Sequence, residues 1–218
     1  MKKLTKITAA TVLVAGSALM STGALAAGEV SYNVGFASEY YYRGVFQEDS
    51  SASAGIDYEN SGFYAGAWTA DVGDGLEIDG YFGYGIETDA GISASVGFTG
   101  YYYTGEFDDT YEEINLSFGY KMLSVGYSIG EYEGFGDEQD YDFLEITLSS
   151  EKGFYGTYGS FGDDFDGDYI EVGYGTSVAE FDVGIAAIFS SDELSDQVDS
   201  DGDATESEAV VFTIGKTF

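Results

Sequence analysis

Carboxylates dominate the chemistry that this sequence can perform. The chain has 40 Asp and Glu residues against 7 Lys and Arg, and it contains no His and no Cys. Without His or Cys it cannot form a Ser-His-Asp triad, a thiolate nucleophile or a Cys-based zinc site, and no cofactor is expected. The formal charge of −33 excludes nucleic acid as an expected partner, because phosphate binding requires cationic patches.

One set of carboxylates alternates with apolar residues along the chain. Unpaired carboxylates cannot be buried in a dry environment without becoming protonated, so we expect them in a wet interior. Asp and Glu side chains around a pore raise the local concentration of cations and repel anions. The expected pore-lining residues are Glu39, Asp57, Glu77, Asp79, Glu113, Glu145, Glu171 and Asp182.

Arg43 is the only arginine of the chain and follows three consecutive tyrosines. We expect it at the pore rim, where it pairs with Glu39 or reaches a lumen carboxylate and narrows the path. Glu77 and Asp79 would be the pair for a carboxylate-only hydrolase. They are neighbours on one strand, however, which any polar face produces, so no enzyme and no catalytic residue are expected.

A calcium-like pattern occurs near the C-terminus, with Asp199, Asp201 and Asp203 at alternate positions. In an EF-hand loop the sixth position is Gly and the twelfth is Glu, whereas this chain has Ala204 and Val210 there. A specific metal site is therefore not expected. Loose binding of divalent cations near lipopolysaccharide is the alternative use of these acidic loops.

The N-terminus has the three parts of a secretory signal peptide. Lys2, Lys3 and Lys6 precede an apolar or small stretch at 7–25, and Ala24-Leu25-Ala26 supplies the small-residue cleavage pattern. We therefore expect residues 1–26 to be cleaved and residues 27–218 to form one exported domain. Together with the barrel pattern described below, this export signal predicts the bacterial outer membrane as the location.

Apolar and polar residues alternate with a period of two throughout the exported part, which is typical of half-buried strands. This pattern predicts about twelve strands. The expected limits are 30–40, 51–59, 63–71, 76–85, 92–102, 112–120, 123–131, 141–149, 154–161, 169–176, 181–190 and 207–218.

The fold predicted from these strands is an all-β, antiparallel, up-and-down transmembrane β-barrel. The polar faces are rich in Gly, Ser and Ala, which suit a closed wall, and tight turns alternate with long acidic loops. The triplets Tyr40–Tyr42 and Tyr101–Tyr103 are expected in the aromatic girdles at the membrane interfaces. Tyr81, Tyr155 and Phe161 are expected to point inward, so the lumen could also be filled.

The last strand ends in Phe218 and resembles the C-terminal assembly signal of bacterial outer-membrane proteins, which the barrel-assembly machinery reads. Together with ASEYYYRG at 37–44, SGFYAGAW at 61–68 and EIDGYFGY at 77–84, it resembles the TorF-type porins, the Gcw_chp family of proteobacterial outer-membrane proteins. The resemblance implies an outer-membrane barrel with a pore. It supplies no ligand or catalytic residues.

The leading functional hypothesis is a porin-like channel for passive diffusion of small solutes that prefers cations. The alternative is a non-conducting surface or structural barrel, such as an adhesin or receptor, with acidic loops that bind divalent cations. The expected partners are outer-membrane lipid and lipopolysaccharide, the barrel-assembly machinery, and small solutes or cations.

Overall fold

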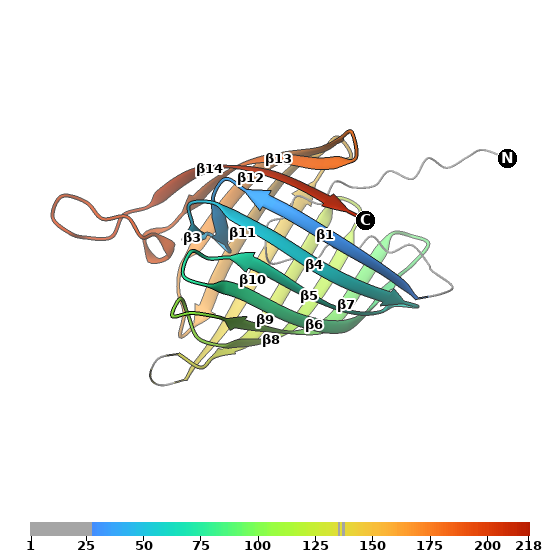
Figure 1. Cartoon of the computed structure of the whole chain (residues 1–218), viewed down its shortest axis with the longest axis horizontal. Coiled ribbons are helices and arrows are strands. Elements are labelled where there is room, and N and C mark those ends of the chain that lie inside the picture. Colours follow the sequence, from blue (N-terminus) through green and yellow to red (C-terminus); the bar gives the residue numbers. More distant parts are fainter. Residues whose placement is uncertain (1–27, 135, 137) are drawn as a thin grey trace.

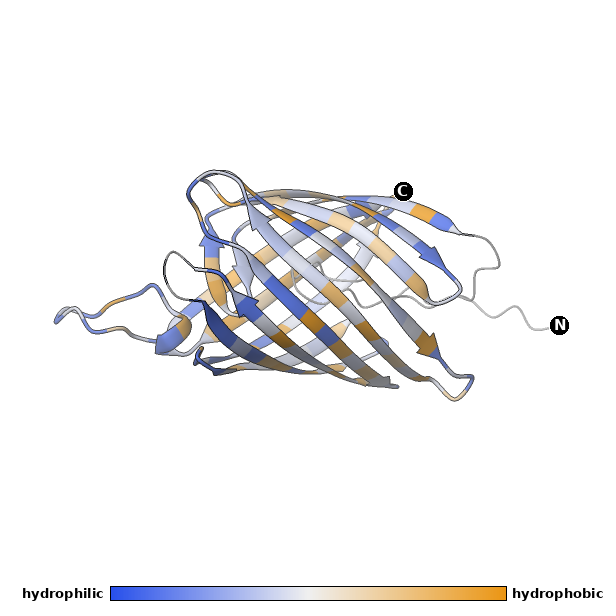
Figure 2. Ribbon diagram, turned by 90° about the horizontal axis from the view of Figure 1, so that it is seen from below, coloured by the Kyte–Doolittle hydropathy of each residue, from blue (hydrophilic) through white to orange (hydrophobic). Residues whose placement is uncertain are grey.

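The alternation of side chains decides which side of each strand faces outward. In the computed structural model, which describes residues 28–134, 136 and 138–218, Val30, Val34 and Phe36 are exposed on the outer wall. The small or polar residues between them, such as Ser31 and Asn33, are half-buried on the inner side. Orange and blue positions accordingly alternate along the strands in Figure 2. The predicted signal peptide, 1–26, lies outside the described residues.

Twelve strands close into one antiparallel barrel, and each pairs with its two neighbours (Figure 1). The predicted fold class is thus confirmed. The barrel strands are β1 (Glu29–Ala37), β4 (Ser51–Asn60), β5 (Phe63–Asp71), β6 (Leu76–Glu87), β7 (Ile92–Tyr103), β8 (Tyr111–Tyr120), β9 (Leu123–Tyr132), β10 (Gln139–Ser149), β11 (Phe154–Asp163), β12 (Asp168–Val178), β13 (Phe181–Ser190) and β14 (Ser207–Thr217). The barrel closes because β1 pairs with β4 on one side and with β14 on the other.

The two ends of the barrel differ in their connections. One end, the short-turn end, carries tight turns such as 61–62 and 121–122, where Ser61 and Lys121 take positive φ values. The other, the long-loop end, carries longer links, among them the β13–β14 loop with the short helix η1 (Asp192–Leu194). This loop extends well beyond the wall, at the end away from the C-terminus (Figure 1). Among the described residues, no helix is long and apolar enough to cross a membrane.

The link between β1 and β4 contains a hairpin that the sequence did not predict. Its strands are β2 (Tyr40–Tyr42) and β3 (Val45–Glu48), which pair with each other in a sheet separate from the barrel. Arg43 and Gly44 form its two-residue turn with φ values of 49° and 82°, the left-handed geometry that matches the twist of paired strands. The expected first strand, 30–40, therefore ends earlier, at Ala37.

The hairpin lies inside the barrel at the long-loop end. Tyr40, Tyr41 and Arg43 are only 5%, 9% and 4% exposed, so the tyrosine triplet belongs to the lumen and not to the interfacial girdle expected from the sequence. Tyr40 packs with Ala70 and Val72 on one side of the lumen. Tyr41 packs on the other side in a cluster that includes Phe143, Tyr169, Ile188, Leu194 and Val211.

Glycines in the wall let inward tyrosines lie flat against it. Tyr81 on β6 is directly opposite Gly66 on β5, and a Cβ at Gly66 would lie 2.5 Å from the Tyr81 ring. Tyr155 on β11 lies in the same way over Gly173 on β12. Because glycine has no side chain, the ring can occupy that space and its hydroxyl can reach along the wall.

Candidate functional site

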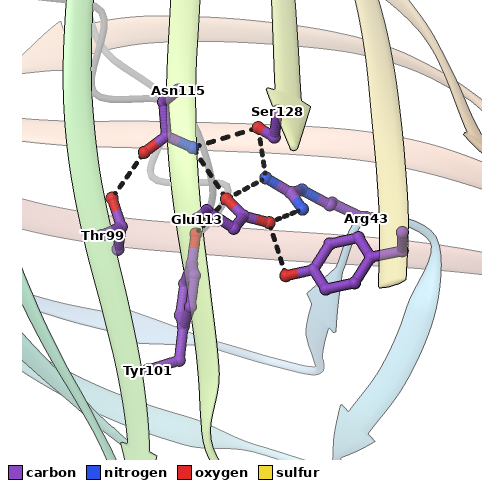
Figure 3. A network of polar contacts seen from close by, with 7 residues as sticks. Arg43, Thr99, Tyr101, Glu113, Asn115 and Ser128 are labelled. Carbon is purple, nitrogen blue, oxygen red and sulfur yellow. Dashed lines mark hydrogen bonds and ion pairs between the residues drawn. The ribbon is translucent and has the colours of Figure 1, made fainter. Parts of the chain in front are cut away.

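The tip of the hairpin binds the opposite wall through Arg43. Its Nη1 forms an ion pair with Oε1 of Glu113 on β8, and its Nη2 donates to Oε2 of the same residue at 3.0 Å. The same Nη2 also donates to Oγ of Ser128 on β9 at 3.2 Å (Figure 3). The contact is a two-pronged guanidinium–carboxylate pair, shielded from water because Glu113 is 1% exposed.

Glu113 is also held by the wall itself. The hydroxyls of Tyr101 and Tyr141 donate to it at 3.2 and 2.8 Å, and the side-chain amide of Asn115 donates at 2.7 Å. Asn115 is fixed in turn by Ser128 at 3.0 Å and by the hydroxyl of a neighbouring threonine on β7 (Figure 3). The carboxylate is therefore positioned by β7–β10 independently of the hairpin.

Aromatic rings complete the surroundings of the guanidinium. Cζ of Arg43 lies 4.2 Å from the ring centre of Phe143 on β10 and 4.9 Å from that of Tyr42. Burial opposes the charge on Arg43, but the adjacent Glu113 carboxylate outweighs it and raises the pKa of Arg43 well above its ordinary value. Arg43 thus stays a cation inside the barrel.

Tyrosine hydroxyls, not cations, hold most of the other inward carboxylates. Tyr40 of the hairpin donates to both oxygens of Glu77 at 3.0 Å. Tyr169 reaches Glu145 at 3.4 Å. The same arrangement joins Tyr81 to Asp57 and Tyr155 to Glu171. A hydroxyl donor satisfies a carboxylate oxygen but supplies no counter-charge. Glu77 and Glu171 are only 1% and 2% exposed, so these two are shielded from solvent and do not lie in the wet interior expected from the sequence.

Asp79 is the exception among these carboxylates. It is 8% exposed, and its Oδ1 has no hydrogen-bond partner among the described residues. It lies opposite Trp68 across the β5–β6 pair, and Nε1 of this indole is likewise without a partner in the part of the chain that the structure describes. Glu77 is the nearest carboxylate along the strand. Glu77 and Asp79 lie on the side of the lumen where Tyr40 contacts the wall.

The structure places the sequence-predicted residues in three groups. Six lie on the inner side of the barrel strands: Asp57, Glu77, Asp79, Glu113, Glu145 and Glu171. Asp182, on β13, accepts a hydrogen bond from Ser177 at 2.6 Å close to the short-turn end. Glu39 lies in the link between β1 and β2, not on a barrel strand.

Arg43 differs from its expected position at the rim. Of the two partners considered, Glu39 and a lumen carboxylate, the structure shows the second, because the hairpin turn carries Arg43 inward to Glu113. Sequence reasoning missed the hairpin and its tyrosine donors. The signal was present in the Arg43-Gly44 pair between aromatic residues and Val45, which suits a two-residue turn, although it lacks the usual Asn-Gly or Asp-Gly.

The calcium-like loop is organised by its own backbone. Oδ1 of Asp199 accepts the backbone N–H groups of Asp201 at 2.8 Å and Asp203 at 3.1 Å. These hydrogen bonds lower the pKa of Asp199. Among the described residues, no group of three or more acidic side chains is arranged to hold a metal ion.

A family described as "Bacterial protein of unknown function (Gcw_chp)" matches residues 21–218. The chain belongs to the Gcw_chp family. A comparison of this Gcw_chp chain with curated protein sequences found no significant match.

Solved structures of three Pseudomonas aeruginosa proteins are similar to this Gcw_chp chain at low identity. OprD is 11% identical, with a TM-score of 0.42 and coverage of 87% of this chain and 66% of OprD. OpdK with vanillate is 12% identical, with a TM-score of 0.38 and coverage of 79% and 57%. OccK2 (OpdF) in complex with glucuronate is 12% identical, with a TM-score of 0.36 and coverage of 84% and 60%. The chain thus spans less than two thirds of the length of each.

Proposed function

We propose that this Gcw_chp barrel is an outer-membrane channel for passive diffusion of small solutes and that its lumen prefers cations. One observation carries the proposal: Arg43 is the single cation on the inner side of the described strands, and it neutralises only Glu113. Of the three lysines that the structure describes, Lys121 and Lys152 lie in turns, and Lys216 pairs with the exposed Glu180 at 3.2 Å. The remaining inward carboxylates attract cations and repel anions.

The proposal includes the route by which the chain reaches the membrane. Residues 1–26 are the cleaved export signal, residues 27–218 are the barrel domain, and Phe218 belongs to the signal that the barrel-assembly machinery reads. The long acidic loops then face lipopolysaccharide, where divalent cations bridge like charges. The resemblance to TorF-type porins supports the same assignment, and no catalytic step is part of it.

A second candidate, a non-conducting surface barrel, is favoured by one observation. The hairpin and many aromatic rings occupy the long-loop half of the lumen. Tyr111 and Tyr132 stack at 4.3 Å between ring centres, and Tyr141 stacks on Phe165 at 4.8 Å. A barrel that stays filled in this way would present its acidic loops to a partner and pass no solute.

Recordings from the refolded barrel in planar bilayers under a salt gradient test the channel. We expect a reversal potential that indicates cation preference, and a smaller preference in the Asp57→Asn/Glu171→Gln variant. Neither residue contacts Arg43, so the hairpin stays in place. The matched control is Asp201→Asn/Asp203→Asn, which removes the same charge from an exposed loop and leaves selectivity unchanged.

Two results would contradict the proposal. Anion selectivity of the unmodified barrel would reject the role of the lumen carboxylates. Absence of conductance, both in the unmodified barrel and in an Arg43→Ala variant with a freed hairpin, would favour the non-conducting surface barrel.

A further inference from the structure

The contact between hairpin and wall joins two parts that are built separately. Glu113, Ser128 and Phe143 belong to three adjacent strands of the barrel, β8, β9 and β10. Arg43 arrives on the β2–β3 hairpin, whose sheet shares no backbone ladder with the barrel strands. The hairpin is therefore held in the lumen by contacts of side chains, which include Tyr40 with Glu77 and Ser190 Oγ with the Gly44 carbonyl besides those of Arg43. Its displacement would break no backbone ladder of the barrel wall.

The charge on Glu113 limits how the hairpin can leave. Removing the counter-charge from a buried carboxylate is strongly unfavourable, so simple withdrawal of Arg43 is disfavoured. A solute cation that takes the place of the guanidinium keeps Glu113 paired. Such a solute shifts the equilibrium toward the released hairpin. The size of the shift is set by the affinity of the solute for the position at Glu113 that Arg43 leaves.

The geometry at Glu113 selects among cations. Both carboxylate oxygens and Oγ of Ser128 receive N–H groups from one planar fork, and the ring of Phe143 faces the guanidinium carbon at 4.2 Å. A guanidinium group satisfies all of these contacts at once. An ammonium group is a compact point charge that cannot form the parallel two-pronged bonds, so it fits this position less well.

We infer that Glu113, Ser128 and Phe143 form a guanidinium-binding site in the barrel wall, which Arg43 occupies in the closed state. A small solute that carries a guanidinium group displaces Arg43 and releases the β2–β3 hairpin from the lumen. This inference goes beyond the proposed channel, since binding and release do not require a conducting path.

The first test follows the hairpin in the otherwise unmodified barrel. The chain has no Cys, so a Gln47→Cys variant carries a single thiol on the half-buried strand β3. At saturating methylguanidinium we expect the thiol to react with a soluble maleimide about tenfold faster than in methylammonium of equal ionic strength. Equal reaction rates in the two salts would overturn the inference.

The second test measures binding at the vacated site. In an Arg43→Ala barrel, methylguanidinium should raise the melting temperature saturably, and methylammonium should do so much less. Adding Glu113→Gln should abolish the rise, whereas adding Glu171→Gln, at another buried carboxylate that does not contact Arg43, should preserve it. A rise that survives Glu113→Gln, or that is equal for both ions, would refute the site.

The two tests do not depend on each other or on conductance. If Arg43→Ala fails to fold, the thiol measurement still decides the question, because it keeps Arg43 and Glu113. If the barrel proves sealed in bilayers, the proposed channel fails while guanidinium binding is judged by its own two results.

Discussion

Replacing Glu113 should reduce the free energy of unfolding more than replacing Arg43, although both substitutions break the same buried ion pair. Glu113→Gln leaves the guanidinium, 4% exposed, without a counter-charge, so we expect a loss of about 3–5 kcal/mol in the free energy of unfolding. Arg43→Met leaves a carboxylate that still accepts from Tyr101, Tyr141 and Asn115. Each hydrogen bond to a charged group contributes about 1.5–3 kcal/mol. Because these three hydrogen bonds remain after Arg43→Met, the loss in the free energy of unfolding should be smaller than for Glu113→Gln, about 2–3 kcal/mol.

The double variant Arg43→Met/Glu113→Gln distinguishes a specific pair from general damage. Since it removes both charges together, its loss should fall short of the summed single losses by about 2–3 kcal/mol, at the upper end of typical coupling energies. Equilibrium unfolding in urea, followed by circular dichroism in detergent micelles, measures all four species. The control cycle combines Arg43→Met with Glu171→Gln, which shares no partner with Arg43 and should be additive. Additivity of the first cycle within about 0.5 kcal/mol would refute the claim that this pair holds the hairpin.

Two further predictions concern the tyrosines that lie along the wall. Gly66→Ala places a Cβ 2.5 Å from the ring of Tyr81 and should reduce the free energy of unfolding by about 1–3 kcal/mol. Gly80→Ala, where a Cβ meets nothing within 4 Å, should change it little, and equal losses in urea unfolding would contradict the packing argument. Tyr155→Phe removes the hydroxyl that donates to buried Glu171 and should lower the same free energy by about 1–3 kcal/mol. An unchanged unfolding midpoint would show that this hydrogen bond contributes nothing.

The barrel strands could be predicted because their signal is local. Alternation along a strand records which side chains meet lipid and which meet the lumen, so a short window is enough. The expected ranges 63–71 and 181–190 coincide with β5 and β13, and most other limits differ by one to three residues. Closure also followed from the pattern, since an apolar outer wall with no free edge is the arrangement that lipid requires.

The hairpin could not be predicted in this way, because its position depends on distant contacts. Tyr40 continues the alternation of the first strand as well as it begins β2, and the local pattern cannot choose between them. What decides is the pair formed by Arg43 and Glu113, which are 70 residues apart. The inward set of carboxylates was visible from sequence, but not which one would receive the arginine.

The hairpin also has a mechanical consequence for the barrel. It is anchored beside the seam where β1 meets β14, and its tip is bonded to β8 and β9 across the lumen. A cylinder whose wall is one sheet thick deforms most easily by flattening into an oval. Arg43 and Glu113 therefore connect two opposite sides of the barrel, so the long-loop end resists flattening for as long as this ion pair is intact.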